Sequence, residues 1–282
     1  MSLPDIEFDQ SFALVTGAGG GMGEHIAKGL ARRGADLGLV DINEEGLTRV
    51  VSEIEAQTEA AVTPFVLDLA DREAVGSWLD GLPESHPGIN LLINNAGVAL
   101  GGRFTEVEAA DFDWLLEINL LAPIRITRAL LPLLERNGNA QVVNLSSLFG
   151  LVGPAGQTAY STAKFGLRGF SESLRNELEM DGVPVGVTCV HPGGIKTNIA
   201  KSARISGATD PQEVAKFQNA FDKMLKYPAD KAAEQIIEAA RKRQARLLIG
   251  TDAQGLDVLA RVLPGAYGGV MKRAMELAAR FS

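Results

Sequence analysis

Short runs of apolar residues alternate with amphipathic segments from residue 12 to about residue 190. Each run is rich in Val, Ile and Leu, a composition typical of strands that are buried on both faces of a parallel sheet. The pattern predicts six strands in this region and a seventh near residues 246–250, namely FALVTG, DLGLVD, VTPFVLDL, INLLINNAG, AQVVNLSS, VPVGVTCVHPG and RLLIG.

The segments between the apolar runs have helical periodicity. Their apolar side chains recur three or four positions apart, as one buried face of a helix requires. Examples are Leu47, Val50, Val51 and Ile54 in one segment and Val75, Trp78 and Leu79 in the next. N-caps are predicted at Asn43, Asp71 and Asp210, and Pro211 suits the first turn of the helix that Asp210 would begin.

Alternating strands and helices predict right-handed βαβ units, and therefore an α/β fold in which helices cover both faces of a doubly wound parallel sheet. No repeat, low-complexity tract or linker divides the chain, so we expect a single domain over residues 1–282.

Two segments depart from the strand rhythm. The segment at about 195–227 follows a strand's carboxyl end, where this fold places structure that covers ligands, and a substrate lid is predicted there. A C-terminal extension at about 251–282 contains two predicted amphipathic helices separated by Pro264 and Gly265. It could pack on the lid, join an oligomer interface or lie against a membrane, and packing is the interpretation we favour.

Charge and cysteine content narrow the function classes. A net charge of −8 and a pI near 5.1 argue against nucleic-acid binding. The longest basic cluster, ARKRQAR at 240–246, is predicted to be the solvated end of a helix. We expect the single cysteine, Cys189, to be a buried core residue, and one cysteine fits a reducing cytoplasm. The sequence shows no signal or membrane-spanning pattern, so a soluble cytoplasmic protein without membrane association is predicted. Three scattered histidines, His191 among them, predict no metal site.

A glycine loop joins the first predicted strand to a helix that begins near Met22. Its sequence TGAGGGMG reads Gly17-x-x-x-Gly21-x-Gly23 instead of the general G-x-G-x-x-G. Glycines admit positive φ and let backbone N–H groups approach a pyrophosphate, which the positive end of the helix also favours. The loop predicts a dinucleotide site, although a tight turn or a methyltransferase on a similar sheet would use some of the same residues.

Asp41 strengthens the dinucleotide interpretation. It closes the second strand twenty positions after Gly21, about where an acidic residue accepts hydrogen bonds from the adenosine ribose. Its carboxylate would repel the 2′-phosphate of NADP, and no Arg or Lys lies in the glycine loop or directly after Asp41 to offset it. NAD is therefore predicted in preference to NADP. A helix-capping role for Asp41 is the alternative, for which Asn43 is better placed.

Two tyrosines have a lysine four positions later, Tyr160 with Lys164 and Tyr227 with Lys231. Residues at this spacing share a helical face, so a phenol and an ammonium can meet one bound molecule. Pro228 disfavours helix at Tyr227 and is expected to start a helix, so the second pair need not share a face. A phenol that acts as an acid/base near neutrality needs its pKa lowered by roughly 3 units, about 4 kcal/mol, which one ammonium supplies only in a partly desolvated crevice.

In their order along the chain these motifs resemble those of a short-chain dehydrogenase/reductase of the single-domain, NAD(P)-binding Rossmann type. The resemblance covers roughly residues 10–200. It rests on TGAGGGMG, DL at 68–69, NNAG at 94–97, the asparagine of LEINLLAP, SS at 146–147, YSTAK and HPGGIKT. The ordered set is specific, whereas several of its members are weak alone.

The resemblance implies a catalytic set. Tyr160 is the general acid/base, and Lys164 lowers the Tyr160 pKa and binds the nicotinamide ribose. Ser147, thirteen positions before Tyr160, hydrogen-bonds the substrate oxygen. Asn119 kinks its helix and positions a water for a proton relay, with Pro123 as the alternative cause of a kink.

The glycine loop, Asp41 and the resemblance together imply the cofactor-binding residues. Asp68 binds adenine through its side chain, and Asn95 lines the cofactor or, like Asn94, ties strand ends together. The segment at 192–197 meets the carboxamide side of nicotinamide. The full set is Gly17, Gly21, Met22, Gly23, Asp41, Asp68, Leu69, Asn95, Ala96, Gly97, Tyr160, Lys164, Pro192, Gly193, Ile195 and Thr197.

These residues predict reversible hydride transfer between NAD(H) and an alcohol or ketone. The residues expected to line the pocket are mostly apolar, which favours a hydrophobic secondary alcohol; they are Leu148, Phe149, Leu151, Val152, Gln157 and the loop 100–104. Alternatives are the same reaction with NADP(H), a dinucleotide-binding sensor or scaffold without turnover, a dehalogenase-like enzyme on this fold, and a methyltransferase. The resemblance further implies a homodimer or homotetramer built partly from the helices that carry Asn119 and Tyr160.

Overall fold

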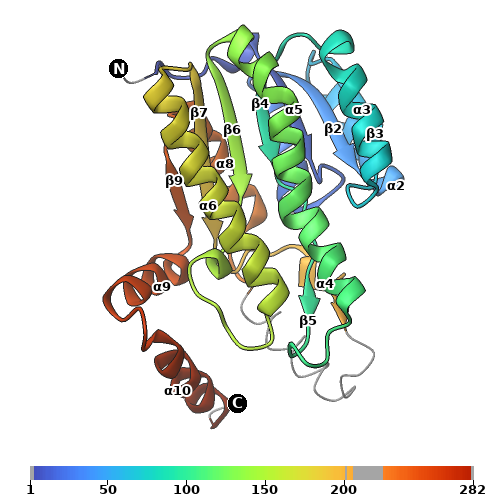
Figure 1. The fold of residues 1–282 in the computed structure, drawn as a ribbon. Coiled ribbons are helices and arrows are strands. Elements are labelled where there is room, and N and C mark those ends of the chain that lie inside the picture. Colours follow the sequence, from blue (N-terminus) through green and yellow to red (C-terminus); the bar gives the residue numbers. More distant parts are fainter. Residues whose placement is uncertain (1–2, 201, 206–224, 281–282) are drawn as a thin grey trace.

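The computed structural model describes residues 3–200, 202–205 and 225–280 (Figure 1). Seven strands form one sheet in the order β3-β2-β1-β4-β6-β7-β9, and every neighbouring pair is parallel. The strands are β1 (Phe12–Thr16), β2 (Asp36–Asp41), β3 (Val62–Val66), β4 (Ile89–Asn94), β6 (Ala140–Leu145), β7 (Val185–Pro192) and β9 (Arg246–Ile249). All seven coincide with predicted strands.

Helices cover both faces of this sheet, as Figure 1 shows. One face packs against α1 (Gly21–Ala31), α2 (Glu44–Glu55) and α8 (Ala229–Arg241), and the other against α3 (Arg72–Ser85), α5 (Ala122–Asn137) and α6 (Thr158–Asp181). Alternating side chains supply both interfaces, since Ala13 and Val15 of β1 belong to the first core cluster and Leu14 to the second. The prediction of a doubly wound α/β fold is confirmed.

The order of the strands determines where a ligand can bind. β1 pairs with β2 on one side and with β4 on the other, so the chain reverses direction across the sheet at β1. In this type of sheet the crevice lies outside the carboxyl ends of the strands at the point of reversal. Apart from Asn119, Tyr160 and Lys164, every predicted site residue lies at the carboxyl end of β1, β2, β3, β4, β6 or β7: in the last residue of the strand, in the loop that follows, or in the first turn of α1.

The predicted helix starts are nearly all reproduced. Asn43 caps α2 with its side-chain oxygen 3.2 Å from a first-turn N–H, and Asp71 caps α3 with oxygen to nitrogen distances of 3.0 and 3.1 Å. Pro228 is the N-cap of α8, which begins at Ala229, one position after the predicted start. The cap predicted at Asp210 lies outside the described residues.

A second, two-stranded sheet was not predicted. β5 (Leu100–Gly101) pairs in parallel with β8 (Arg204–Ile205), which belongs to the predicted lid. Strands of two residues carry no hydrophobic alternation, so the pattern along the chain cannot indicate them. Of the predicted lid at 195–227, residues 201 and 206–224 lie outside the described part.

The basic cluster at 240–246 is less solvated than predicted. Its first residues do end α8, but Arg243 donates to the carbonyl oxygens of Pro4 and Ala140, both at 2.6 Å, and Arg246 pairs with Asp257 at 2.5 Å. These arginines therefore fasten the N-terminal segment, the start of β6 and α9 (Thr251–Val262) to one another.

The C-terminal extension forms two helices, α9 and α10 (Tyr267–Arg280), with the predicted break between them. Figure 1 shows both helices beyond the carboxyl end of β9, beside the loop that leads into α6. Among residues 3–200, 202–205 and 225–280 no helix is long and apolar enough to cross a membrane.

Candidate active site

The glycine loop between β1 and α1 has the tight geometry that a dinucleotide site needs. Gly17 and Gly21 have φ values of +67° and +57°, in the left-handed region. A Cβ on Gly17 would lie 2.8 Å from the Cα of Ala96, and a Cβ on Gly23 would lie 2.0 Å from the carbonyl oxygen of Gly17. No side chain can therefore block the backbone where a pyrophosphate would approach it, and the loop fits a dinucleotide.

Asp41, at the end of β2, contacts this loop directly. Its Oδ2 accepts a hydrogen bond from the N–H of Gly19 at 2.8 Å, and its Oδ1 accepts one from the N–H of Asn43 at 2.9 Å. The N-cap of α2 is nevertheless Asn43, as predicted. Asp41 thus fixes the shape of the glycine loop and still presents its carboxylate to the cavity beside it.

The two asparagines after β4 tie strand ends together. Asn95 donates through Nδ2 to the carbonyl oxygens of Thr16 at 2.9 Å and Gly17 at 3.1 Å. Asn94 is buried and donates to Oδ1 of Asn144 on β6 at 2.8 Å. Both side chains therefore tie strand ends together, which was the alternative role given to them. Asn95 also sets the position of the glycine loop.

A cavity of about 260 Å³ brings the predicted adenosine-side residues together. Those in its wall are Gly17, Asp41, Asp68, Leu69, Ala96 and Gly97. Among the lining residues that were not predicted are Trp114 of α4 (Ala109–Leu116) and Arg204 of β8, whose guanidinium carbon lies 3.5 Å from the Trp114 ring centroid. Arg204 reaches this cavity because β8 pairs with β5, and no local sequence signal indicates that pairing.

Asn119 lies in a π-helical turn, η2 (Glu117–Leu121), between α4 and α5. Its buried amide binds the main chain of Val98 twice, with Oδ1 accepting from the N–H and Nδ2 donating to the carbonyl oxygen, each at 2.8 Å. Pro123 has no N–H and cannot donate the ordinary helical bond to the Asn119 carbonyl. The irregularity expected at Asn119 is present, and Pro123 contributes to it.

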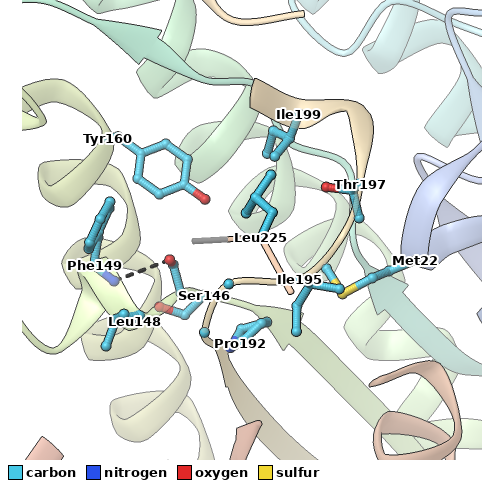
Figure 2. Close-up of a pocket in the computed structure, with 13 residues that line it drawn as sticks. Met22, Ser146, Leu148, Phe149, Tyr160, Pro192, Ile195, Thr197, Ile199 and Leu225 are labelled. Atoms are coloured by element: carbon cyan, nitrogen blue, oxygen red, sulfur yellow. Dashed lines mark hydrogen bonds between the residues drawn. The ribbon is translucent and has the colours of Figure 1, made fainter. Parts of the chain in front are cut away.

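A smaller pocket, of about 90 Å³, lies where the predicted substrate site should be (Figure 2). Ser147 after β6, Tyr160 in the first turn of α6 and the segment 192–197 after β7 all line it. Figure 2 shows Tyr160 on one side and Met22 of the glycine loop on the opposite side, with Ile195 and Thr197 near Met22. The pocket therefore adjoins both the glycine loop and the Tyr160 hydroxyl.

Lys164 lies one helical turn after Tyr160 and is 3% exposed. Its Nζ donates to the carbonyl oxygen of Leu145 at 2.9 Å and lies 5.6 Å from the Tyr160 ring centroid. Burial lowers the pKa of Lys164 to about 8. The tyrosine and the lysine share a helical face, as their spacing predicts.

Burial has the largest effect on the pKa of Tyr160. Burial raises this pKa above its ordinary value, and a hydrogen bond with Ser147 opposes the rise. Removing a phenolate from water outweighs that single bond, and the Lys164 ammonium is itself disfavoured by burial. Burial therefore outweighs the bond with Ser147, and the role predicted for Lys164 in lowering the Tyr160 pKa stays a prediction.

His191 and Cys189 of β7 are buried structural residues, as expected. The Nδ1 of His191 lies 3.1 Å from the carbonyl oxygen of Ser147, and its Nε2 lies 3.5 Å from the Cys189 sulfur. Burial lowers the pKa of His191 to about 4 and raises the pKa of Cys189 to about 11, so both are neutral at pH 7. Their contacts support the main chain beneath Ser147.

Tyr227 and Lys231 do not form a second catalytic pair. Tyr227 precedes the N-cap Pro228, and its hydroxyl accepts a hydrogen bond from Gln235 of α8. Its main chain forms a bridge with Ile195. The two residues belong to different elements, which is the consequence expected from Pro228.

The C-terminal extension packs against the wall of the substrate pocket. Leu148 and Phe149, in the short helix η3 (Leu148–Gly150), belong to a cluster with Ala253 of α9 and with Tyr267 and Met271 of α10. On its other side Phe149 makes an edge-to-face contact with Tyr160, with ring centroids 6.2 Å apart. The extension therefore packs within the chain, and it does so against η3 instead of the predicted lid.

Comparisons with known proteins agree with this geometry. The model of the family described as short chain dehydrogenase matches residues 11–206. A putative oxidoreductase SadH of Mycobacterium tuberculosis is 38% identical over 261 residues, which cover 92% of this chain and 93% of the relative.

Solved structures extend the likeness to three dimensions. A short chain dehydrogenase/reductase from Burkholderia phymatum in complex with NAD superposes with a TM-score of 0.84 at 27% identity, covering 92% of this chain and 95% of that one. A short-chain dehydrogenase from Sphingobium yanoikuyae in complex with NADPH gives 0.74 at 27% identity, covering 93% and 95%. With the glycine loop, Ser147, Tyr160 and Lys164 converging on one crevice, the chain belongs to the short-chain dehydrogenase family and is an NAD(P)-dependent dehydrogenase/reductase.

Proposed function

We propose that the protein transfers hydride reversibly between NAD(H) and the carbon that carries the oxygen of a hydrophobic secondary alcohol or its ketone, with Tyr160 as the general acid/base. One observation carries the proposal: Ser147, Tyr160, Met22 and the segment 192–197 line a single pocket that adjoins the glycine loop. A substrate oxygen in this pocket can meet two hydroxyl groups at once. A nicotinamide cofactor held by the glycine loop, Asp41 and Lys164 would supply the hydride acceptor for oxidation and the hydride donor for reduction.

Ser147 and Tyr160 divide the handling of the substrate oxygen. The Oγ of Ser147 accepts a hydrogen bond from the N–H of Phe149 at 3.1 Å, and its own proton, which faces Tyr160, can be donated to a substrate oxygen that enters between them. Ser147 orients the substrate oxygen, while Tyr160 removes the hydroxyl proton in oxidation and returns it in reduction. Lys164 binds the nicotinamide ribose, and it adds its positive charge to that of the oxidised nicotinamide to favour the Tyr160 phenolate.

We assign the water of the proton relay to the main chain at Asn119. Both groups of the Asn119 amide bind Val98, which holds the side chain against the main chain of Val98, although one N–H and one lone pair of the amide remain. Pro123 frees the Asn119 carbonyl from its ordinary helical donor. A water there extends the path of the proton away from Lys164 and out of the crevice.

The charges around the glycine loop support NAD over NADP. Asp41 shares the adenosine-side cavity and would repel a 2′-phosphate. Arg49, whose Nη2 lies 3.5 Å from the carbonyl oxygen of Gly19, is paired with Glu24 at 2.7 Å and with Glu53 at 3.0 Å. Its charge is therefore balanced by two carboxylates and is a poor partner for an additional phosphate.

The pocket lining supports an apolar substrate. Besides the catalytic hydroxyls, apolar side chains make up most of the wall; among them are Leu148, Phe149, Ile199 and Leu225. We infer one catalytic domain over residues 1–282, a cytoplasmic location and a homodimer or homotetramer. The residues proposed for the cofactor are those named from the sequence, with Arg204 and Trp114 added; of the residues predicted to line the substrate pocket, Leu148 and Phe149 do so, whereas Leu151, Val152, Gln157 and the loop 100–104 are not part of its wall.

Replacing Tyr160 by Phe tests the mechanism. The loss of the phenolic proton should lower kcat by about 10²-fold to 10⁴-fold, while the dissociation constant for NADH changes little, because the ring and the cavity remain. The measurement is NAD-linked absorbance change with secondary alcohols of graded size, with Tyr227→Phe as the matched control. Normal turnover by Tyr160→Phe would refute the acid/base role, and NADH binding without turnover of any alcohol by the natural chain would favour a sensor.

A further inference from the structure

The segment 192–197 is held in place by residues from much later in the chain. On one side, the N–H of Lys196 donates to the carbonyl oxygen of Tyr227 at 2.8 Å, and the N–H of Tyr227 donates to the carbonyl oxygen of Gly194 at 2.9 Å. On the other side lies Asp252, in the first turn of α9. Since Gly193 and Gly194 have no side chains to anchor them, these contacts determine where their peptide groups lie.

Asp252 fits closely against this segment. Its Oδ2 accepts a hydrogen bond from the N–H of Gly194 at 2.8 Å, and its Oδ1 accepts one from the N–H of Ala253 at 2.9 Å. A Cβ on Gly193 would lie only 2.1 Å from Oδ1, and a Cβ on Gly250 only 2.4 Å from it. The carboxylate therefore occupies a socket formed by two glycines, one on each side.

The socket links the wall of the substrate pocket to the turn after β9 and to α9. Gly193 and Gly194 line the substrate pocket together with Tyr160, Gly250 ends the turn after β9, and Ala253 packs against Leu148 in η3. An acidic side chain in the first turn of α9 is also favoured by the helix dipole. Asp252 is thus the point at which the C-terminal extension and the segment after β7 are fixed relative to one another.

We propose that Asp252 is a positioning residue that fixes the 193–194 peptide for the nicotinamide end of the cofactor. This proposal rests on the proposed function, because it assumes that the segment after β7 contacts nicotinamide. Loss of the carboxylate frees the Gly194 N–H and gives two glycines room to move. The affected part of the cofactor is the nicotinamide, because the adenosine-side cavity is lined by Gly17, Asp41 and Asp68 among others and by neither Gly193 nor Gly194.

The test compares NADH with ADP-ribose, which has the same adenosine and pyrophosphate but no nicotinamide. Dissociation constants of both ligands are measured by titration calorimetry for the natural chain, Asp252→Ala and Asp252→Asn. We expect Asp252→Ala to weaken NADH about 10-fold more than ADP-ribose, a difference of about 1.4 kcal/mol. Asp252→Asn keeps an oxygen acceptor and should give a smaller difference.

Asp257→Ala is the matched control. Asp257 lies on the same helix and pairs with Arg246 at 2.5 Å and Arg261 at 3.1 Å, so its loss disturbs α9 without touching residues 193–194. It should change the two affinities by equal factors. Equal losses of NADH and ADP-ribose in Asp252→Ala would overturn the proposal, and Asp252→Asn provides the same comparison if the alanine variant does not fold. Failure of the natural chain to bind NADH would instead refute the proposed function.

Discussion

At the scale of single residues, Lys164 and Tyr160 face the same physical difficulty. Each is disfavoured in its charged form by burial, which lowers the pKa of Lys164 to about 8 and raises that of Tyr160. The Lys164 ammonium nevertheless keeps a main-chain partner, the carbonyl of Leu145 at 2.9 Å. The site thus holds a poorly solvated ammonium close to a phenol. A charged ligand bound beside them would change the pKa of both groups.

Lys164→Met should alter how stability depends on pH. In the unfolded chain the lysine ionises near 10.5, whereas in the folded chain its pKa is about 8. Between these values the unfolded state binds a proton that the folded state lacks, so the natural protein gains stability as pH rises from about 8 to about 10, and Met removes this gain. Denaturant unfolding across that range measures it, with Lys231→Met as control. A difference between natural protein and variant that is independent of pH would contradict a lowered lysine pKa.

Asp41→Asn should relax the preference for NAD. The amide keeps the size of the side chain and removes the negative charge that faces the adenosine-side cavity. We expect the ratio of kcat/KM for NADP to that for NAD to rise about 10-fold, which corresponds to about 1.4 kcal/mol of relieved repulsion. Steady-state kinetics with both cofactors measure the ratio. Asp36→Asn, at the other end of β2, is the control, and the same ratio in both variants would exclude Asp41 as the discriminating charge.

At the scale of elements, η3 links the C-terminal extension to the substrate. Its residue Phe149 contacts the Tyr160 ring on one side, and the cluster that contains Tyr267 and Met271 packs on the other. The hydroxyl of Tyr267 also accepts a hydrogen bond from the N–H of Gly153 at 3.2 Å. A change in α10 can therefore move the pocket wall without touching the cofactor.

Met271→Ala should raise KM for large alcohols more than for small ones. Removing apolar atoms behind η3 leaves the wall less firmly packed, and a bulky substrate depends on that wall more than a small one does. We expect the KM of the largest alcohol accepted to rise roughly 3-fold to 10-fold, with NADH affinity unchanged. Met180→Ala is the control, because Met180 is 86% exposed in the last turn of α6. Equal effects on alcohols of every size would show that α10 does not shape the pocket.

Elements that depend on local patterns could be predicted, and those that depend on pairing between distant segments could not. The seven strands, the glycine loop and the cap at Asn43 each leave a signal within a few residues. Arg204 enters the cavity only through the pairing of β8 with β5, and Asp252 meets Gly194 across 58 positions. The Tyr160 pKa was also beyond sequence analysis, since spacing identifies a neighbouring lysine but says nothing about desolvation.

At the scale of the whole molecule, the site lies at the carboxyl ends of the sheet strands, and η2 and α6 expose apolar side chains to solvent. Leu121, at the end of η2, is 37% exposed, and Phe165, on α6, is 40% exposed. The two elements are in close contact, since a Cβ on Gly166 would lie 2.9 Å from the Leu120 side chain. An exposed leucine and phenylalanine on adjoining elements suit a surface that a second copy covers.

Phe165→Glu should therefore separate the proposed homo-oligomer into monomers. A carboxylate placed between two such surfaces would lose its hydration and gain no partner. Its desolvation free energy should exceed the association free energy that the interface provides. Sedimentation velocity gives the mass of the natural chain and the variant, and Met180→Glu adds the same charge at the far end of α6. If Phe165→Glu sediments like the natural oligomer, α6 does not form the interface. If the natural chain is already a monomer, Leu121 and Phe165 remain exposed and the active site is complete within one chain.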